Sequence, residues 1–301
     1  MKTKNRIENP FRLKCFRCKF VKCIDFFTSQ KKNVGGEYYI AHRSIKEKFL
    51  PCIVGTCIET LCKIGVKLNR ISKEGMQPIQ FILPQTIRDL RCSFFLAFHG
   101  HYRNAFQTLR PPIENFLAGL YFQFGIAHGY LSWDDFEDWT EGNYKISGEL
   151  YEKFCGNRKY KEKLDYSFSL EFLVKINVLK GKWKSWIEKN IFHLLNKYLH
   201  PNFKYFELHP ECIGCPAIVK YEEKELNKWL ETFQRIVWFI IISIFEIFGF
   251  ENFEKDEEVK EAISKLTIQP EIVPQFVRNN EYRHLLKEIN KRWREISLKN
   301  K

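Results

Sequence analysis

Residues 84–127 read PQTIRDLRCSFFLAFHGHYRNAFQTLRPPIENFLAGLYFQFGIA, and this stretch decides the fold class. Its apolar residues recur every three or four positions, which is the period of one face of an α-helix. Pro84 and Thr86 are typical of a helix start. Pro111 and Pro112 interrupt the pattern, because proline has no N–H and its ring clashes with the preceding turn. We therefore expect two helices that meet at Pro111–Pro112, the second with proline in its first turn.

The helical period extends over most of residues 44–297. Further helices or helical segments are expected at 44–68 (interrupted at Pro51), at 132–141 (opened by a loose capping box, Ser132–Asp135), at 166–198 (broken at Gly181), at 222–248, at 251–266 and at 275–297. The second half of 222–248 is apolar nearly all round, which predicts a buried central helix. The sequence thus predicts an all-α protein, a multi-helix bundle in which residues 1–301 form a single helical domain.

Composition bounds the class of protein. The 301 residues are 45% hydrophobic and 28% charged, as in soluble globular proteins, and they are unusually rich in aromatic residues, with 28 Phe. The apolar stretch Ile236–Phe250 is short for a membrane span and contains Glu246, so we interpret it as a buried helix and expect no membrane association. No secretion signal is apparent, and ten cysteines then indicate a reducing, cytoplasmic setting.

Two Cys-x-x-Cys pairs are the sharpest chemical signal. Cys15 and Cys18 lie in KCFRCKF, and Cys212 and Cys215 lie in ECIGCPA, each between short strand-like segments. Four thiolates suit one tetrahedral, structural Zn²⁺, so segments 11–24 and 205–219 together predict a small zinc-ribbon-like attachment. The alternatives are two unrelated reduced pairs or an iron–sulfur cluster. Cys23 and His209 are reserve ligands. Cys52, Cys57 and Cys62 are five residues apart, which on a helix predicts small core residues rather than a second metal site.

The positive charge is concentrated at the two ends. Residues 1–50 hold 13 Lys and Arg against 4 Asp and Glu, residues 275–301 hold 8 against 3, and residues 51–274 hold 28 against 29. Clustered positive charge favours RNA, DNA or an acidic protein as partner, although basic ends also promote solubility alone. The basic C-terminal helix, 275–301, has an apolar stripe with cations largely off it. We list Lys287, Lys291, Arg292 and Arg294 as candidate nucleic-acid-binding residues.

The polar residues of the helical core have two interpretations. His99, Arg103, Arg110 and Glu114 fall near one helix face, and Arg110 with Glu114 forms either a structural clamp or the lining of an anion pocket. His200, just before Pro201, either caps a helix end or acts as a base. The chain has no Gly-rich phosphate loop, no His-Glu-x-x-His and no nucleophile elbow, so ordinary nucleotide-dependent or hydrolase chemistry is unsupported.

Two of these elements carry a resemblance. The helix with Leu-Arg-x-x-x-Glu at 109–114, followed by Leu-Asn-Lys-Tyr-Leu-His-Pro at 195–201, resembles uncharacterised all-α proteins that are similar to the HEPN domains of microbial defence and toxin systems. Active members carry Arg-x4–6-His and cleave RNA, and Arg278 and His284 match that spacing. The resemblance implies an alternative function, a metal-independent ribonuclease with these two residues in the active site of a homodimer.

Overall fold

The computed structural model describes residues 50–71, 77–156, 158–199, 223–253 and 255–268. Within these ranges the secondary structure is helical and includes no strand. The elements are α4 (Leu50–Ile71), α5 (Pro78–Phe98), α6 (Tyr102–Thr108), α7 (Arg110–Ala127), α8 (Trp133–Glu141), α9 (Gly148–Cys155), α10 (Tyr166–Lys175), α11 (Gly181–Ile187), the π-helical turn η1 (Glu188–Phe192), α12 (His193–Leu199), α13 (Glu223–Phe248), the 3-10 turn η4 (Phe250–Asn252) and α14 (Glu257–Ile268). The predicted all-α helical bundle is confirmed. The segments 11–24, 205–219 and 275–301 lie outside the described residues, so the zinc-ribbon-like attachment stays a prediction.

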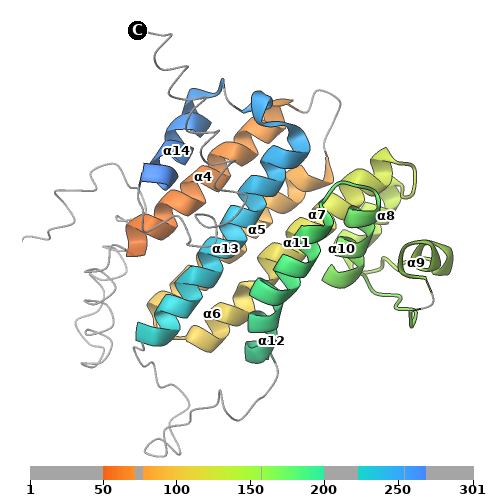
Figure 1. Cartoon of the computed structure of the whole chain (residues 1–301), viewed down its shortest axis with the longest axis horizontal. Helices are drawn as coiled ribbons and strands as arrows, with labels where there is room; N and C mark the ends of the chain where they lie inside the picture. The colour runs from red at the N-terminus through yellow and green to blue at the C-terminus, as the bar shows by residue number, and fades with distance from the viewer. Residues whose placement is uncertain (1–49, 72–76, 157, 200–222, 254, 269–301) are drawn as a thin grey trace, which may run out of the picture.

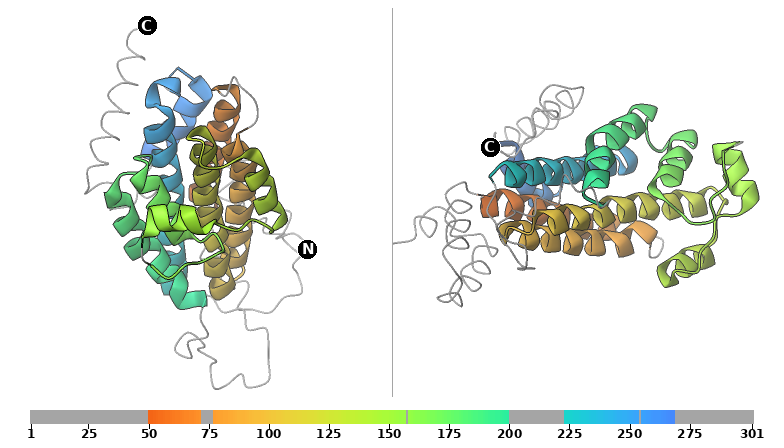
Figure 2. Two further views of the ribbon diagram at one scale, coloured as in Figure 1. Left: turned by 90° about the vertical axis from the view of Figure 1, so that its right-hand side faces the viewer. Right: turned by 90° about the horizontal axis from the view of Figure 1, so that it is seen from below.

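The long helices α4, α5, α7 and α13 run side by side (Figure 1). Helix α14 packs on α4, and α5 packs on both α6 and α7. The consecutive elements α11, η1 and α12 lie along α13, while α8, α9 and α10 gather at one end of the molecule (Figure 2). One hydrophobic cluster includes side chains from each of the described α-helices.

The proline-based prediction for the middle of the chain is half right. Helix α6 ends at Thr108 and α7 begins at Arg110 with Pro111 and Pro112 in its first turn, so the predicted junction is confirmed. The predicted start at Pro84 is wrong, because α5 begins at Pro78 and continues through Pro84. Pro84 costs this helix one backbone hydrogen bond, because proline has no N–H. Ile79, Ile82 and Leu83 before Pro84 are buried, and their burial outweighs that loss.

Two further helix boundaries can be compared with the sequence-based expectations. Ser132 caps α8: its hydroxyl accepts from the backbone N–H of Asp135 at 3.2 Å, and the Asp135 carboxylate accepts from the Ser132 N–H at 2.7 Å. A capping box therefore forms although aspartate replaces the usual glutamate. The helix expected to break at Gly181 is interrupted just before it: α10 ends at Lys175 and α11 begins at Gly181, with Asn177 at φ 60° in the turn between them.

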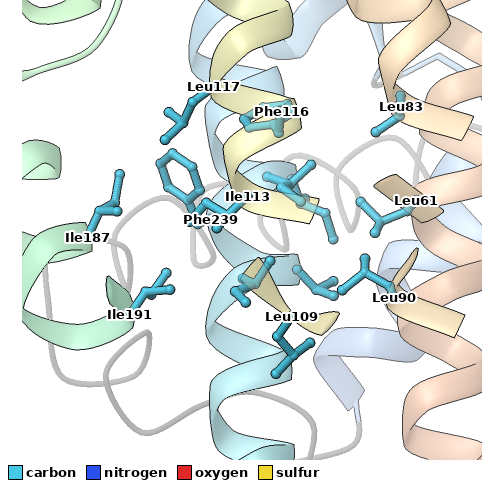
Figure 3. Packing of buried hydrophobic residues seen from close by; sticks show 14 of the residues in the cluster. Leu61, Leu83, Leu90, Leu109, Ile113, Phe116, Leu117, Ile187, Ile191 and Phe239 are labelled. Carbon is cyan, nitrogen blue, oxygen red and sulfur yellow. The ribbon is translucent and has the colours of Figure 1, made fainter. Parts of the chain in front are cut away.

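Helix α13 is the predicted central helix. Residues 236–245 are all buried, so the helix is enclosed on every side in its second half. Figure 3 shows Phe239 of α13 between α7 and the α11–η1 segment, and its ring meets Phe116 at 5.8 Å and Trp183 at 5.0 Å between centroids. Despite this apolar stretch, no helix in the described part of the chain has the length and hydropathy needed to span a bilayer.

Candidate nucleic-acid interface

Most residues singled out by motif fall outside the described ranges. These are the candidate metal ligands Cys15, Cys18, Cys212 and Cys215, the candidate catalytic pair Arg278 and His284, and the candidate nucleic-acid-binding residues Lys287, Lys291, Arg292 and Arg294. Among the residues that are described, no group of three or more His, Cys, Asp or Glu side chains is placed to hold a metal ion. Cys57 is buried in the core of α4, as expected for a small apolar residue, and Cys62 is half-buried.

The junction of α6 and α7 directs polar side chains towards α12. Arg103 and Gln107 of α6 donate to the carbonyl oxygen of Tyr198, from Nε at 3.4 Å and from Nε2 at 3.1 Å. Arg110, at the start of α7, donates to Asn196, which lies two residues before Tyr198 on α12. Three of the four predicted polar residues are thus brought together, whereas His99 ends α5 and lies against Phe95.

Arg110 is held on several sides. Its Nε donates to Glu114 Oε1 at 2.6 Å, and its Nη1 donates to Asn196 Oδ1 at 3.0 Å. Its Cζ lies 5.8 Å from the ring centroid of Tyr166 and 5.9 Å from that of Phe192, two rings that stack on each other. The Arg110 and Glu114 side chains are 26% and 32% exposed, so this pair stands at the surface rather than in the core. A half-exposed pair is worth little as a clamp by itself.

A π-helical turn sets the angle at which α12 meets Arg110. In η1 the His193 N–H bonds to the Glu188 carbonyl, five residues back, which inserts one residue into an otherwise α-helical segment. Arg235 of α13 donates from Nη1 to the Asn190 carbonyl at 3.1 Å. The wider turn is therefore stabilised from outside by α13, and such turns occur frequently at functional sites.

The C-terminal end of α12 is tied to two other helices. The Tyr198 ring stacks on Phe106 of α6 at 3.9 Å between centroids, and its hydroxyl donates to Glu225 Oε2 of α13 at 2.5 Å. Its carbonyl accepts from Arg103 and Gln107, so α6 side chains cap this helix end. His200, expected to cap the helix or act as a base, lies outside the described residues.

The outer face of α11, η1 and α12 is a basic stripe. We define the stripe as five exposed residues that follow one another at spacings of three or four: Lys182, Ser185, Lys189, His193 and Lys197. Lys189 and Lys197 form no ion pair with any residue that the structure describes. Asn196, which holds Arg110, precedes Lys197 and flanks the stripe.

Charge is segregated within the bundle, a feature that the count over residues 51–274 conceals. Residues 158–199 contain 10 Lys and Arg against 4 Asp and Glu, whereas residues 132–156 contain 2 against 7. The acidic stretch forms α8 and α9, and the basic stretch forms α10 to α12. A charge count in shorter windows would have revealed the basic stretch. Its arrangement as a stripe depends on the π-helical turn.

A cavity of about 290 Å³ lies between α4 and α5 and is mostly apolar. Arg91 and Cys62 line this cavity, and Arg91 Nη2 lies 3.7 Å from the Cys62 sulfur.

Comparisons with family models, with curated proteins and with solved structures give no match. The functional argument therefore rests on the residues of this chain.

Proposed function

We propose that this protein binds nucleic acid through basic surfaces, one of which is the stripe on α11, η1 and α12. The observation that carries the proposal is the stripe itself, with Lys189 and Lys197 exposed and without ion pairs among the described residues. Other exposed lysines of the fold have acidic neighbours, among them Lys161 and Lys180 at 2.8 Å each. Cations that remain unpaired along one helix face are suited to the phosphates of RNA or DNA.

The charged ends of the chain support the same partner. Residues 1–49 and 275–301 carry the excess of the net charge, and both segments lie outside the described ranges. A stripe on the body and two basic ends favour a long polyanion over a small ligand, because a polymer collects many weak phosphate contacts. RNA and DNA share this phosphate chemistry, and base contacts would have to distinguish them.

Salt-dependent binding of labelled RNA and DNA tests the proposal. Fluorescence anisotropy should show binding that weakens steeply as salt rises, since each phosphate contact contributes about 0.9 to the slope of log K against log salt. Lys189→Glu with Lys197→Glu should weaken binding and reduce the slope by about 2. Arg88→Glu with Lys255→Glu makes the same charge change at two exposed cations outside α11–α12 and should bind more tightly than the stripe variant. Salt-insensitive binding, or no binding, would contradict the proposal.

A structural zinc ion belongs to the same proposal. The donor set of Cys15, Cys18, Cys212 and Cys215, four thiolates in two Cys-x-x-Cys turns, suits tetrahedral Zn²⁺ and leaves no open position for catalysis. Residues 200–222, which contain the second pair, connect α12 to α13, and the Tyr198–Glu225 hydrogen bond ties those two helix ends together. Elemental analysis of protein purified without added metal should give one zinc per chain. Cys15→Ser should lose it and Cys57→Ser should keep it, whereas iron or no metal would refute the zinc site.

The second candidate function is a HEPN-like, metal-independent ribonuclease. It is supported by the packing of the two elements that carry the resemblance, since Arg110 of the first hydrogen-bonds to Asn196 of the second. In that chemistry His284 would transfer a proton and Arg278 would stabilise charge on the phosphate. The test is cleavage of RNA in EDTA that is lost in His284→Ala. Intact RNA with both proteins would leave nucleic-acid binding without catalysis.

A further inference from the structure

We propose that Arg110 and Asn196 form an oxyanion site that takes one phosphate group of the bound nucleic acid, an inference that rests on the proposed function and deepens it. The site lies where the start of α7 meets α12, beside the basic stripe. Its recognition elements are hydrogen-bond donors that the fold holds in place without using them.

The donors follow from the chemistry of the two side chains. A guanidinium carries five N–H groups and no acceptor. In Arg110 one N–H serves Glu114 and one serves Asn196, and the described residues supply no partner for the other three. Because arginine only donates, the oxygen of the Asn196 amide must face Nη1. The Asn196 Nδ2, bonded to the same carbon as that oxygen, therefore lies close to the guanidinium and adds further N–H donors.

The guanidinium is oriented before a ligand arrives. Glu114 fixes one edge at 2.6 Å, Asn196 fixes Nη1 at 3.0 Å, and the stacked rings of Tyr166 and Phe192 lie close beside the group. Arginine in such a setting loses little conformational entropy on binding, and its planar fork matches two oxygens of a phosphate. A side chain that is 26% exposed is accessible to a ligand and partly shielded from water.

The charge around the site favours an anion despite Glu114. Arg110 itself and the exposed Lys197 next to Asn196 supply two positive charges against this one carboxylate. A strand that follows the stripe from Lys189 to Lys197 passes Asn196, so one of its phosphates comes within reach of the free guanidinium edge. A phosphodiester in a polymer and free inorganic phosphate present the same oxygens, and the experiment separates them.

The test uses inorganic phosphate and RNA on the full chain. Phosphate should raise the melting temperature of the wild type, and Arg110→Gln should abolish this rise and weaken RNA binding by about tenfold, the loss expected for a charge-assisted hydrogen bond. Arg110→Lys keeps the charge but not the fork, and should also lose most of the phosphate response. Arg158→Gln is the control, because Arg158 is also an arginine paired with a glutamate, Glu171. It should respond as the wild type does.

Asn196→Asp keeps the proposal falsifiable if the Arg110 variants fold poorly. Aspartate still accepts from Arg110 and preserves the local structure, but it replaces the Nδ2 donors with negative charge. It should abolish the phosphate response without loss of stability, and an unchanged response would refute the site and leave Arg110 as a clamp. RNA binding that depends on the stripe but not on Arg110 or Asn196 would likewise refute the site alone. A phosphate response that needs Arg110, in a protein that binds no nucleic acid, would uphold the site and refute the proposed function.

Discussion

A buried hydrogen-bond relay between three helices gives the clearest quantitative prediction. Trp229 of α13 donates from Nε1 to the Ser93 hydroxyl of α5 at 2.8 Å, and that hydroxyl donates to the Ala105 carbonyl of α6 at 2.7 Å. All three residues are fully buried. Ser93→Ala leaves the indole N–H without a partner in a region that excludes water, which costs about 1–3 kcal/mol. The Ala105 carbonyl still accepts from the Leu109 N–H at 3.1 Å, so only one group is orphaned.

Equilibrium urea unfolding, followed by far-UV circular dichroism and by tryptophan fluorescence, measures this cost. Ser169→Ala is the matched control, because Ser169 is equally buried but its hydroxyl donates to the Asp165 carbonyl of its own helix at 3.2 Å. Its loss orphans no donor, and we expect a change in the free energy of unfolding within about 0.5 kcal/mol.

A double-mutant cycle isolates the orphaned indole. Trp229→Phe removes the donor, so Ser93→Ala should cost about 1 kcal/mol less in that background than in the wild type. Equal costs in both backgrounds, or a Ser93→Ala variant as stable as Ser169→Ala, would refute the reasoning.

Three other predictions concern titration, reactivity and packing. Burial raises the pKa of Glu171, but the hydrogen bond and charge of Lys184 and nearby cations lower it, and the net shift is downward. The ionised Glu171 carboxylate therefore stabilises the fold above the unfolded pKa of about 4.3, and this stabilisation is lost as the pH falls through the lower folded pKa. In urea titrations, the loss of unfolding free energy caused by Glu171→Gln should shrink from pH 6 to pH 3. Burial raises the pKa of Cys57 to about 12. An alkylating reagent at pH 8 should therefore modify the exposed Cys92 first and Cys57 only on unfolding, which peptide mass spectrometry would show. Early labelling of Cys57 would contradict its burial. A Cβ on Gly119 of α7 would lie 3.2 Å from Ile82 of α5. Gly119→Val should therefore push the two helices apart and lower the free energy of unfolding by about 1–3 kcal/mol. An unchanged melting temperature would show that α5 shifts without cost to make room.

Helix existence could be predicted from the sequence because apolar periodicity and proline chemistry act locally. The α6–α7 junction needs only Pro111 and Pro112, and the central position of α13 needs only its all-round apolar second half. The start of α5 was misplaced because Pro84 is a helix breaker in isolation, and only burial of the side chains before it permits the helix to continue. Helix α9, eight residues long, gave no periodic signal strong enough to predict.

The candidate site could be predicted only in part. The four-residue spacing joined Arg110 to Glu114, since both lie on one helix. Asn196 was out of reach, because its contact with Arg110 spans 86 positions and depends on how α12 packs. The basic stripe was missed for a different reason, since a charge count over 51–274 balanced α8 and α9 against α10 to α12.

The π-helical turn allows the helical segment to contain one extra residue without rotating the site out of place. Trp183, Ile187, Ile191 and Leu195 are buried at intervals of four, and a straight α-helix of 3.6 residues per turn rotates such a row by about 40° per step. The inserted residue in η1 turns the helix back and keeps the row buried. If residues 188–192 became a regular α-helix with no residue removed, everything after them would rotate by about 100°, whereas deletion of one residue there would restore a regular helix and keep the later residues facing the same way. In the evolution of this chain, the loss of a single codon there would keep Asn196 facing Arg110, whereas a substitution that straightened the turn at constant length would move Asn196 away while each side chain of the site was retained.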